Sequence, residues 1–250
     1  MAFERAKIKE VLEKVYLIDD AGDSTCYLVC GRDKAVLVDT ANGYEDLRVI
    51  VRTLTDLPVM VVNTHGHGDH IFGNVYFDEA YIHPEDLALA EYFFGCAKED
   101  LDKHGLKPCP LKPIEVGDRI DLGDRELEVV SLRGHTAGSI GLLDRTQRAL
   151  YTGDGLNFHL WMQLDHSLPM AELLESLRTL KAYCGQDFDH VLHGHAREVR
   201  EAAVLDWLIR GCEEILSGQC ENDLPYTYFG GECRQHPISQ VPGECIVYNP

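Results

Sequence analysis

Residues 65–70 read His65-Gly66-His67-Gly68-Asp69-His70 and follow closely on the apolar segment Val59–Val62. In an extended segment, His65 and His67 point to the same side, and the glycines between the donors allow the sharp turns that a ligand loop needs. Asp69 and His70 add a carboxylate and a third imidazole, which are donors that zinc, iron and similar divalent ions accept. The stretch therefore predicts a metal site with enough donors for two cations.

The composition is that of an acidic globular protein, with 250 residues, 45% of them hydrophobic and 26% charged, and a net charge of −19. A chain of this length can bury a sizeable core, so one domain over residues 1–250 is expected. The negative charge repels nucleic acid, and no cluster of Lys or Arg offers a face for a phosphate backbone. We therefore expect a small-molecule substrate and no nucleic-acid partner, with the oligomeric state left open.

The nine cysteines form no Cys-x-x-Cys pair, so free, reduced thiols are expected. The alternative for three of them near the C-terminus is a further metal site, formed by Cys220, Cys233 and Cys245. Residues 1–10 alternate in charge and lack the apolar core of a signal peptide, which predicts a cytoplasmic protein. No apolar stretch approaches the roughly 20 residues that cross a bilayer, so no membrane contact is expected.

Apolar spacing and turn residues predict the secondary structure. Strands are expected at residues 11–18, 25–30, 35–38, 59–62, 80–82, 119–122, 126–132, 139–143, 149–151, 191–192 and 246–248. Helices are expected at 44–54, from Pro84 to about Phe94, at 170–183 and at 198–216. Residues 95–113, rich in Gly and Pro, are expected to form a long loop or lid. The order favours two mainly antiparallel sheets packed face to face with helices outside.

Apolar runs precede potential ligands at four separate places in the chain. They lead into His65, into His135 within Gly134-His135-Thr136, into Asp154 between Gly153 and Gly155, and into His195. Strands that end together can bring distant donors into one cluster, because sites commonly collect at one end of a sheet. The four loops are therefore expected to meet.

These motifs resemble those of the metallo-β-lactamase-fold hydrolases. That superfamily is marked by His-x-His-x-Asp-His, then Gly-His-Thr-x-Gly-Ser, an Asp within Gly-Asp and a final Gly-His, and the chain has all four in this order. The resemblance implies an α/β fold, namely a four-layer αββα sandwich, with two metals in its central cleft. By the same resemblance His65, His67 and His135 would hold one metal, Asp69, His70 and His195 the other, and Asp154 would bridge them.

Two positions depart from the usual family pattern. Phe72 stands where a small glycine is common, and His193 stands where proline often precedes the final Gly-His. Either His193 or His195 is thus a candidate for the terminal donor, and the small Gly194 before it favours His195. Asp39 resembles an outer aspartate of the family that would receive a ligand imidazole's N–H, and its alternative is a turn residue after a strand.

A dinuclear-metal-bound hydroxide would attack a carbonyl or a phosphorus, with Asp69 orienting it or receiving its proton. Zinc is the expected metal, and iron or manganese are the alternatives. Side chains that could line the substrate pocket, or simply anchor core and loops, are Phe72, Tyr76, Asn157, Phe158, His159 and Trp161.

The resemblance implies hydrolysis of a small ester, lactone, thioester or related acyl compound. The alternative is a non-haem iron oxidoreductase of the persulfide dioxygenase or flavodiiron kind, which shares the ligand set.

Overall fold

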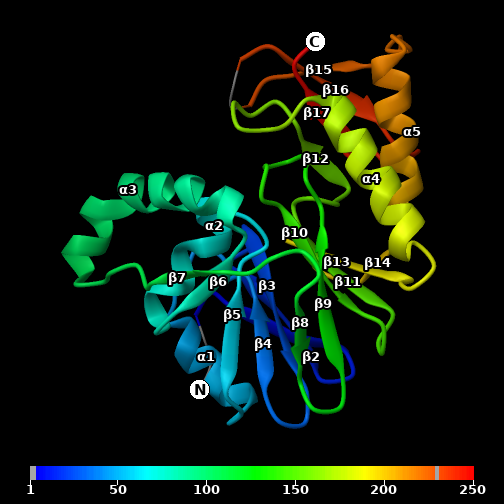
Figure 1. Ribbon diagram of the computed structural model, residues 1–250. Coiled ribbons are helices and arrows are strands. Elements are labelled where there is room, and N and C mark those ends of the chain that lie inside the picture. Colours follow the sequence, from blue (N-terminus) through cyan, green and yellow to red (C-terminus); the bar gives the residue numbers. More distant parts are fainter. Residues whose placement is uncertain (1–3, 229–230) are drawn as a thin grey trace.

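Two large β-sheets pack face to face in the computed structural model of the protein, which describes residues 4–228 and 231–250 (Figure 1). Apolar side chains from both sheets fill the space between them, among them Leu17, Val38, Leu142 and Tyr151. Helices cover the two outer faces, so the αββα sandwich implied by the resemblance is confirmed.

The first sheet runs in chain order through β1 (Lys7–Leu12), β2 (Val15–Asp20), β3 (Ser24–Cys30), β4 (Ala35–Val38), β5 (Val59–Val62), β6 (Ala80–Ile82) and β7 (Leu111–Pro113). From β1 to β4 the pairing is antiparallel, and from β4 to β7 it is parallel. Successive side chains of a strand point to opposite faces, so Val36 and Val38 face the other sheet while Leu37 faces outward. Helix α1 (Leu47–Leu54) covers that outward face.

The second sheet has the strand order β14 (Arg200–Glu201), β13 (His190–His193), β11 (Ala149–Gly153), β10 (Ile140–Asp144), β9 (Glu126–Ser131) and β8 (Arg119–Asp121). The pairing is antiparallel except between β11 and β13. Helices α4 (Met170–Cys184) and α5 (Val204–Leu216) pack on its outer face, where they bury the apolar sides that the sequence predicted for them.

A third sheet, which the sequence did not predict, joins β12 (His159–Trp161), β17 (Cys245–Tyr248), β16 (Cys233–Pro237) and β15 (Leu224–Tyr226) in that order. Only the closing strand at 246–248 was expected in this tail, because the other strands are short and lack a clean alternation of apolar residues. Ile246 and Tyr248 pack in one cluster with residues of α5, beside which the sheet lies in Figure 1. The expectation of a single domain over residues 1–250 stays a prediction.

The helix expected from Pro84 to about Phe94 is longer than predicted. A short 3-10 segment, Pro84–Asp86, leads into α3 (Leu87–His104), and residues 111–113 form β7, so the loop or lid expected at 95–113 is wrong for residues 95–104 and 111–113. This part of the helix lacks the regular apolar spacing used for the prediction and is stabilised by ion pairs between successive turns, such as Lys98–Asp102. Gly105, with a φ of 69°, ends it in the left-handed conformation that glycine adopts most readily.

Two other boundaries differ from prediction. Residues 11–18 span the end of β1 and most of β2, with a turn at Lys14, whose φ is 56°. The helix expected from residue 198 begins only at Val204, because β14 pairs with β13 just before it. None of the helices described within 4–228 and 231–250 is long and apolar enough to cross a bilayer.

Candidate metal centre

Four loops that follow β5, β9, β11 and β13 meet at one end of the sandwich. The first contains His65, His67 and the short helix α2 (Gly68–Ile71), which carries Asp69 and His70. The others carry His135, Asp154 and His195. Because these strands end at the same side of two packed sheets, residues up to 126 positions apart, Asp69 and His195, become neighbours.

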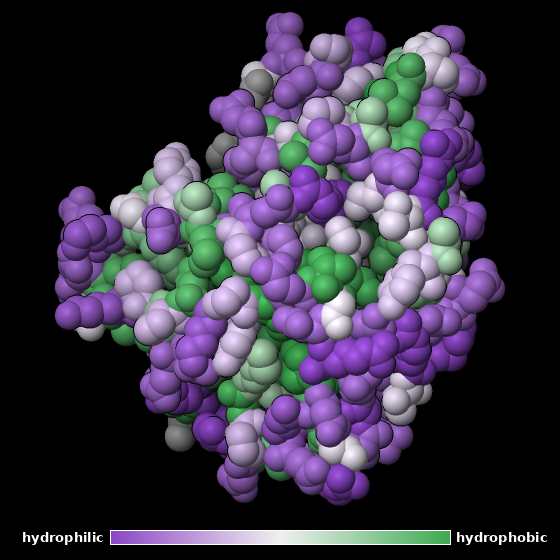
Figure 2. Space-filling model, viewed as in Figure 1, coloured by the Kyte–Doolittle hydropathy of each residue, from purple (hydrophilic) through white to green (hydrophobic). Residues whose placement is uncertain are grey.

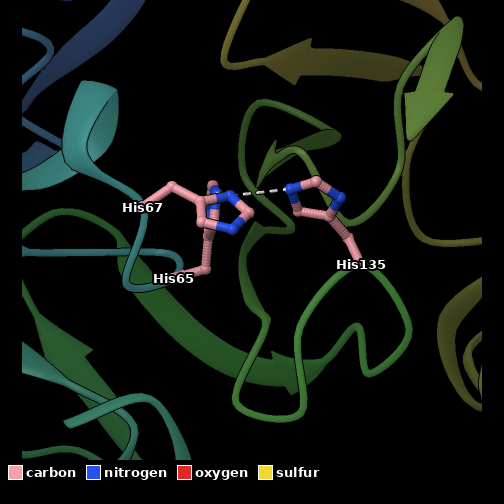
Figure 3. A group of neighbouring side chains, drawn as sticks. All are labelled: His65, His67 and His135. Atoms are coloured by element: carbon pink, nitrogen blue, oxygen red, sulfur yellow. Dashed lines mark hydrogen bonds between the residues drawn. The ribbon is translucent and has the colours of Figure 1, made fainter. Parts of the chain in front are cut away.

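His65, His67 and His135 form the first group of potential ligands (Figure 3). Nδ1 of His67 lies 3.0 Å from Nε2 of His65 and 2.9 Å from Nε2 of His135, so three imidazole nitrogens converge on one point. All three side chains are buried. Burial lowers the pKa of each of them, which favours neutral imidazoles with a lone pair available for a cation.

Asp69, His70, Asp154 and His195 surround a second point. Oδ2 of Asp154 lies 3.1 Å from Nε2 of His195 and 3.7 Å from Nε2 of His70, and Oδ2 of Asp69 lies 3.5 and 3.6 Å from the same two nitrogens. Oδ2 of Asp154 is also 3.8 Å from Nε2 of His135 in the first group. Asp154 therefore stands between the two groups, where a bridging ligand would stand.

Two buried ligand atoms at this point make no hydrogen bond to the rest of the described chain. Within the described residues, neither Nε2 of His70 nor Oδ1 of Asp154 has a hydrogen-bond partner, although both are buried. Leaving such groups unpaired is costly, and a divalent cation would satisfy both. A side chain at Gly194 would also fill this space, because its Cβ would overlap Cε1 of His70. The residues at this point thus fit a divalent cation.

The charges of the second group depend on one another. Burial alone would lower the pKa of His70, but the carboxylates of Asp69, Asp154 and Asp39 outweigh it and raise that pKa well above its usual value. Asp154 raises the pKa of His195 to about 9 against the effect of burial. In return, His195 and His70 hold the pKa of Asp154 well below its usual range, although burial alone would raise it. The imidazoles and carboxylates of this group therefore stabilise one another's charged forms.

The second nitrogen of each ligand candidate is also in contact. Nδ1 of His135 lies 2.7 Å from the carbonyl oxygen of Trp161, and Nδ1 of His195 lies 2.8 Å from the carbonyl oxygen of Asp23. Such outer contacts set which nitrogen faces the centre. Nε2 of His67 contacts His166, which is a neighbour that the sequence did not assign to the metal ligands.

The carboxylate of Asp39 supports His70 from behind. Oδ2 lies 2.9 Å from Nδ1 of His70 and accepts the Thr64 hydroxyl at 2.8 Å, while Oδ1 accepts the Thr64 N–H at 2.7 Å. Nε2 of His70 is thereby turned toward the other ligand candidates. The geometry matches the outer role implied by the family resemblance, and that role stays a prediction.

His193 points elsewhere. Its ring lies 5.8 Å from that of Phe158, and its Nδ1 accepts the backbone N–H of His195 at 3.3 Å. Burial lowers the pKa of His193 to about 3. The ligand atom of His195, rather than that of His193, lies among the other donors, so the geometry favours His195.

The six candidate pocket residues divide into two sets. Phe72 and Tyr76 pack in hydrophobic clusters around α1 and α3, Phe158 is part of the core, and Asn157 caps a loop by accepting the N–H of His159. His159 and Trp161 lie on β12 beside the ligand loops, and their rings contact that of Tyr226 on β15. Trp161 contacts a ligand candidate directly, since its carbonyl oxygen lies 2.7 Å from Nδ1 of His135, and the pocket role of all six residues stays a prediction.

Asp86 is a supporting residue that the sequence analysis missed. Its buried carboxylate accepts the N–H of Gly66 at 2.7 Å, the N–H of Gly138 at 2.7 Å and the hydroxyl of Thr136 at 2.7 Å. It thus joins the loop of His65 to the loop of His135. No local motif marks it, because its partners lie 20 to 52 residues away.

Comparison with known proteins agrees with this geometry. A sequence model of the family described as "Metallo-beta-lactamase superfamily" matches residues 19–204. A curated relative named acyl-coenzyme A thioesterase MBLAC2, from Gallus gallus, is 28% identical over 170 residues, which are 58% of this chain and 61% of the relative. A hydroxyacylglutathione hydrolase from Nostoc punctiforme is 32% identical over 123 residues, which are 49% of this chain and 43% of the relative. The chain thus spans less than two thirds of the length of these relatives.

Solved structures share the fold. A metallo-β-lactamase from Erythrobacter litoralis superposes with a TM-score of 0.64 at 20% identity, covering 86% of this chain and 99% of that one. The sec-alkylsulfatase Pisa1 from Pseudomonas sp. superposes with a TM-score of 0.67 at 15% identity, covering 85% and 42%. At these identities the likeness concerns the fold alone.

Proposed function

The chain belongs to the metallo-beta-lactamase superfamily, and from this we propose that it is a metal-dependent hydrolase of acyl compounds. His65, His67 and His135 would hold one divalent cation, Asp69, His70 and His195 the other, and Asp154 both. The observation that carries the proposal is the pair of unpartnered donors, Nε2 of His70 and Oδ1 of Asp154, buried at the meeting point of four loops in the described chain. Zinc is the metal that we expect.

When bound, such a pair of cations makes a water acidic enough to attack near neutral pH and draws electrons from the acyl oxygen. The protein's own part begins with Asp69. Its side chain is 36% exposed, whereas that of His70 is fully buried, so Asp69 is the carboxylate with access to solvent. We propose that the Asp69 carboxylate, through the oxygen that does not hold the cation, receives the proton that the attacking water loses.

Aromatic side chains on both sides of the centre favour a substrate with an apolar part. Phe93 of α3 packs against His67 with ring centroids 5.4 Å apart. On the other side, the ring of Trp161 lies 5.3 Å from that of Tyr228 and 6.5 Å from that of Tyr226. Figure 2 shows hydrophobic residues over α3 and in the middle of a face that is otherwise mainly hydrophilic.

Among acyl compounds, we propose thioesters as the first class to test. Two relatives have names that denote cleavage of an acyl-coenzyme A and of a hydroxyacylglutathione, in both of which an acyl group is joined to a thiol compound. The large thiol compound of such a thioester would have to reach the centre from solvent, and the exposed ring of Tyr228, beside Trp161, offers an aromatic surface for it.

The test combines metal content with turnover. Protein purified without oxygen is assayed for bound metals and for hydrolysis of an acyl-coenzyme A, a lactone and a phosphate monoester. We expect zinc, the fastest turnover on the thioester, and a loss of at least about 100-fold in kcat/KM for Asp154→Ala. The matched control Asp78→Ala removes a carboxylate whose side chain is 93% exposed, so it should keep both metal and activity. Full activity in Asp154→Ala would refute the proposal, and bound iron with oxygen uptake on persulfides would support the oxidoreductase instead.

A further inference from the structure

A second group of potential metal ligands lies between α5 and the C-terminal sheet and shares no residue with the candidate metal centre. It consists of Cys220, Asp223 and His236, whose ligand atoms all lie within 4.8 Å of one another. We propose that these three residues form a structural site for a zinc-class divalent cation. The proposal does not depend on the proposed hydrolase function.

The local backbone brings two of the three ligands together. Cys220 and Asp223 flank a tight turn just after α5, in which the N–H of Asp223 donates to the carbonyl of Cys220 at 3.2 Å. Two ligands with two residues between them are a common spacing in structural zinc sites. His236 arrives from β16, so the site joins the end of the helix to the sheet.

The imidazole of His236 is held in the orientation that a metal ligand needs. Nε2 lies 2.9 Å from Oε2 of Glu214 on α5, and Nδ1 faces Oδ1 of Asp223 at 2.7 Å. An N–H directed from Nε2 to Glu214 leaves the lone pair of Nδ1 toward Asp223 and Cys220. Metal-binding histidines typically have such a carboxylate behind the ring.

A hydrogen bond likewise fixes the orientation of the Asp223 carboxylate. Tyr248 donates its hydroxyl proton to Oδ2 of Asp223 at 2.6 Å, so the other oxygen, Oδ1, faces the cluster. Burial and the contact with Asp223 raise the pKa of Tyr248, which keeps this hydroxyl a donor. The same hydroxyl lies 3.3 Å from Sγ of Cys220. Three donors of different chemistry, sulfur, oxygen and nitrogen, therefore converge.

The surroundings of the three ligands are buried and contain a second carboxylate. The side chain of Asp223 is fully buried and that of His236 is 5% exposed, and a second carboxylate, Glu214, stands next to them. Nε of Arg210 lies 3.9 Å from Oε1 of Glu214. A divalent cation with a Cys220 thiolate and a neutral His236 leaves the same net charge, close to zero, as a protonated His236 between the two carboxylates, so the ligand geometry carries the proposal and the charge does not. A thiolate, an imidazole and a carboxylate are ligands that zinc accepts.

An occupied site would stabilise the wall of the candidate metal centre. β16 pairs with β17, and β17 pairs with β12, in which the carbonyl of Trp161 contacts His135. Tyr226 on β15, which also pairs with β16, packs on Trp161. The cation would hold this sheet to α5, with the three side chains as its protein ligands and a water in the remaining position of a tetrahedral site.

The test uses cobalt(II) in place of zinc in the full-length protein. None of the seven candidate ligands of the first centre is a thiol, so a thiolate-to-cobalt charge-transfer band in the near ultraviolet can come only from a cysteine site. We expect this band in the wild-type protein. In Cys220→Ser we expect the band to disappear and the bound cobalt to fall by one equivalent. The matched control Cys96→Ser replaces an exposed thiol on α3 and should keep the band.

Further variants separate this proposal from the proposed hydrolase function. Asp154→Ala should lose metal from the first centre and still show the band, and His236→Gln should lose the band while it keeps the metal of the first centre. A wild-type protein without the band, or an unchanged band in Cys220→Ser, would overturn the proposal and would mean that the cluster is held by hydrogen bonds and ion pairs alone. Circular dichroism confirms that each variant is folded.

Discussion

Replacement of Asp39 by asparagine tests how the protein supports His70. The φ of residue 39 is 60°, a left-handed conformation that asparagine tolerates better than most residues, so the backbone should be retained. The carboxylate accepts hydrogen bonds from Nδ1 of His70 and from the backbone and side chain of Thr64. In Asp39→Asn one accepting oxygen becomes an NH2 group, so at least one of these buried donors loses its partner.

The expected magnitude follows from these contacts. Loss of an outer partner of a ligand imidazole typically weakens metal affinity about 10- to 100-fold, which corresponds to roughly 1.4 to 2.7 kcal/mol. The unpaired buried donor should also lower the free energy of unfolding by about 1 to 3 kcal/mol. Both effects arise behind His70, so the first group, His65, His67 and His135, should keep its own cation.

The assay is a zinc titration against a chromophoric chelator, with thermal unfolding of the metal-free protein measured in parallel. Of the two equivalents of zinc expected in the candidate metal centre, Asp39→Asn should bind one more weakly and leave the other nearly unchanged, and the proposed Cys220 site should be unaffected. The control Asp78→Asn alters an exposed surface ion pair and should change the free energy of unfolding by less than about 0.5 kcal/mol. If Asp39→Asn is folded and binds both equivalents within twofold of the wild-type affinity, Asp39 does not orient His70 and the reasoning fails.

Three other predictions concern the same centre. Gly194→Ala should lose metal, because the new Cβ would overlap His70 and lie 2.9 Å from Oδ1 of Asp154. In the control Gly95→Ala on α3, the new Cβ meets no atom within 4 Å, so this variant should bind metal as the wild type does. Equal metal content in the two variants would contradict this prediction. Asp86→Ala should lower the free energy of unfolding by about 2 kcal/mol or more, measured in urea, because three buried donors lose their acceptor. In the metal-free protein, Asp154 raises the pKa of His195 to about 9, so the stability from this pair is present below the unfolded value of about 6.5 and is lost as pH rises through about 9. Zinc competes with that proton, and its measured affinity should therefore increase from pH 6 to about pH 9; a flat profile would contradict the assignment.

The positions of the buried strands and the order of the ligand motifs could be predicted from the sequence, because both depend on residues that are close together in the chain. β3, β4, β5 and β6 lie where their apolar runs predicted them, to within a residue, and so does α4. Predictions failed where local apolar spacing was absent. The second half of α3 is held by charged pairs, and the C-terminal strands are short segments whose partners lie elsewhere in the chain.

The amino-acid sequence by itself determined which residue types are available to bind metal and that they follow strands. Only the tertiary structure decided that His195 rather than His193 turns toward Asp154, that Asp86 links two ligand loops, and that Cys220 meets His236. The physical reason is that these are contacts between side chains far apart along the chain. Their distances depend on how whole sheets and helices pack, and no nearby residue carries that information.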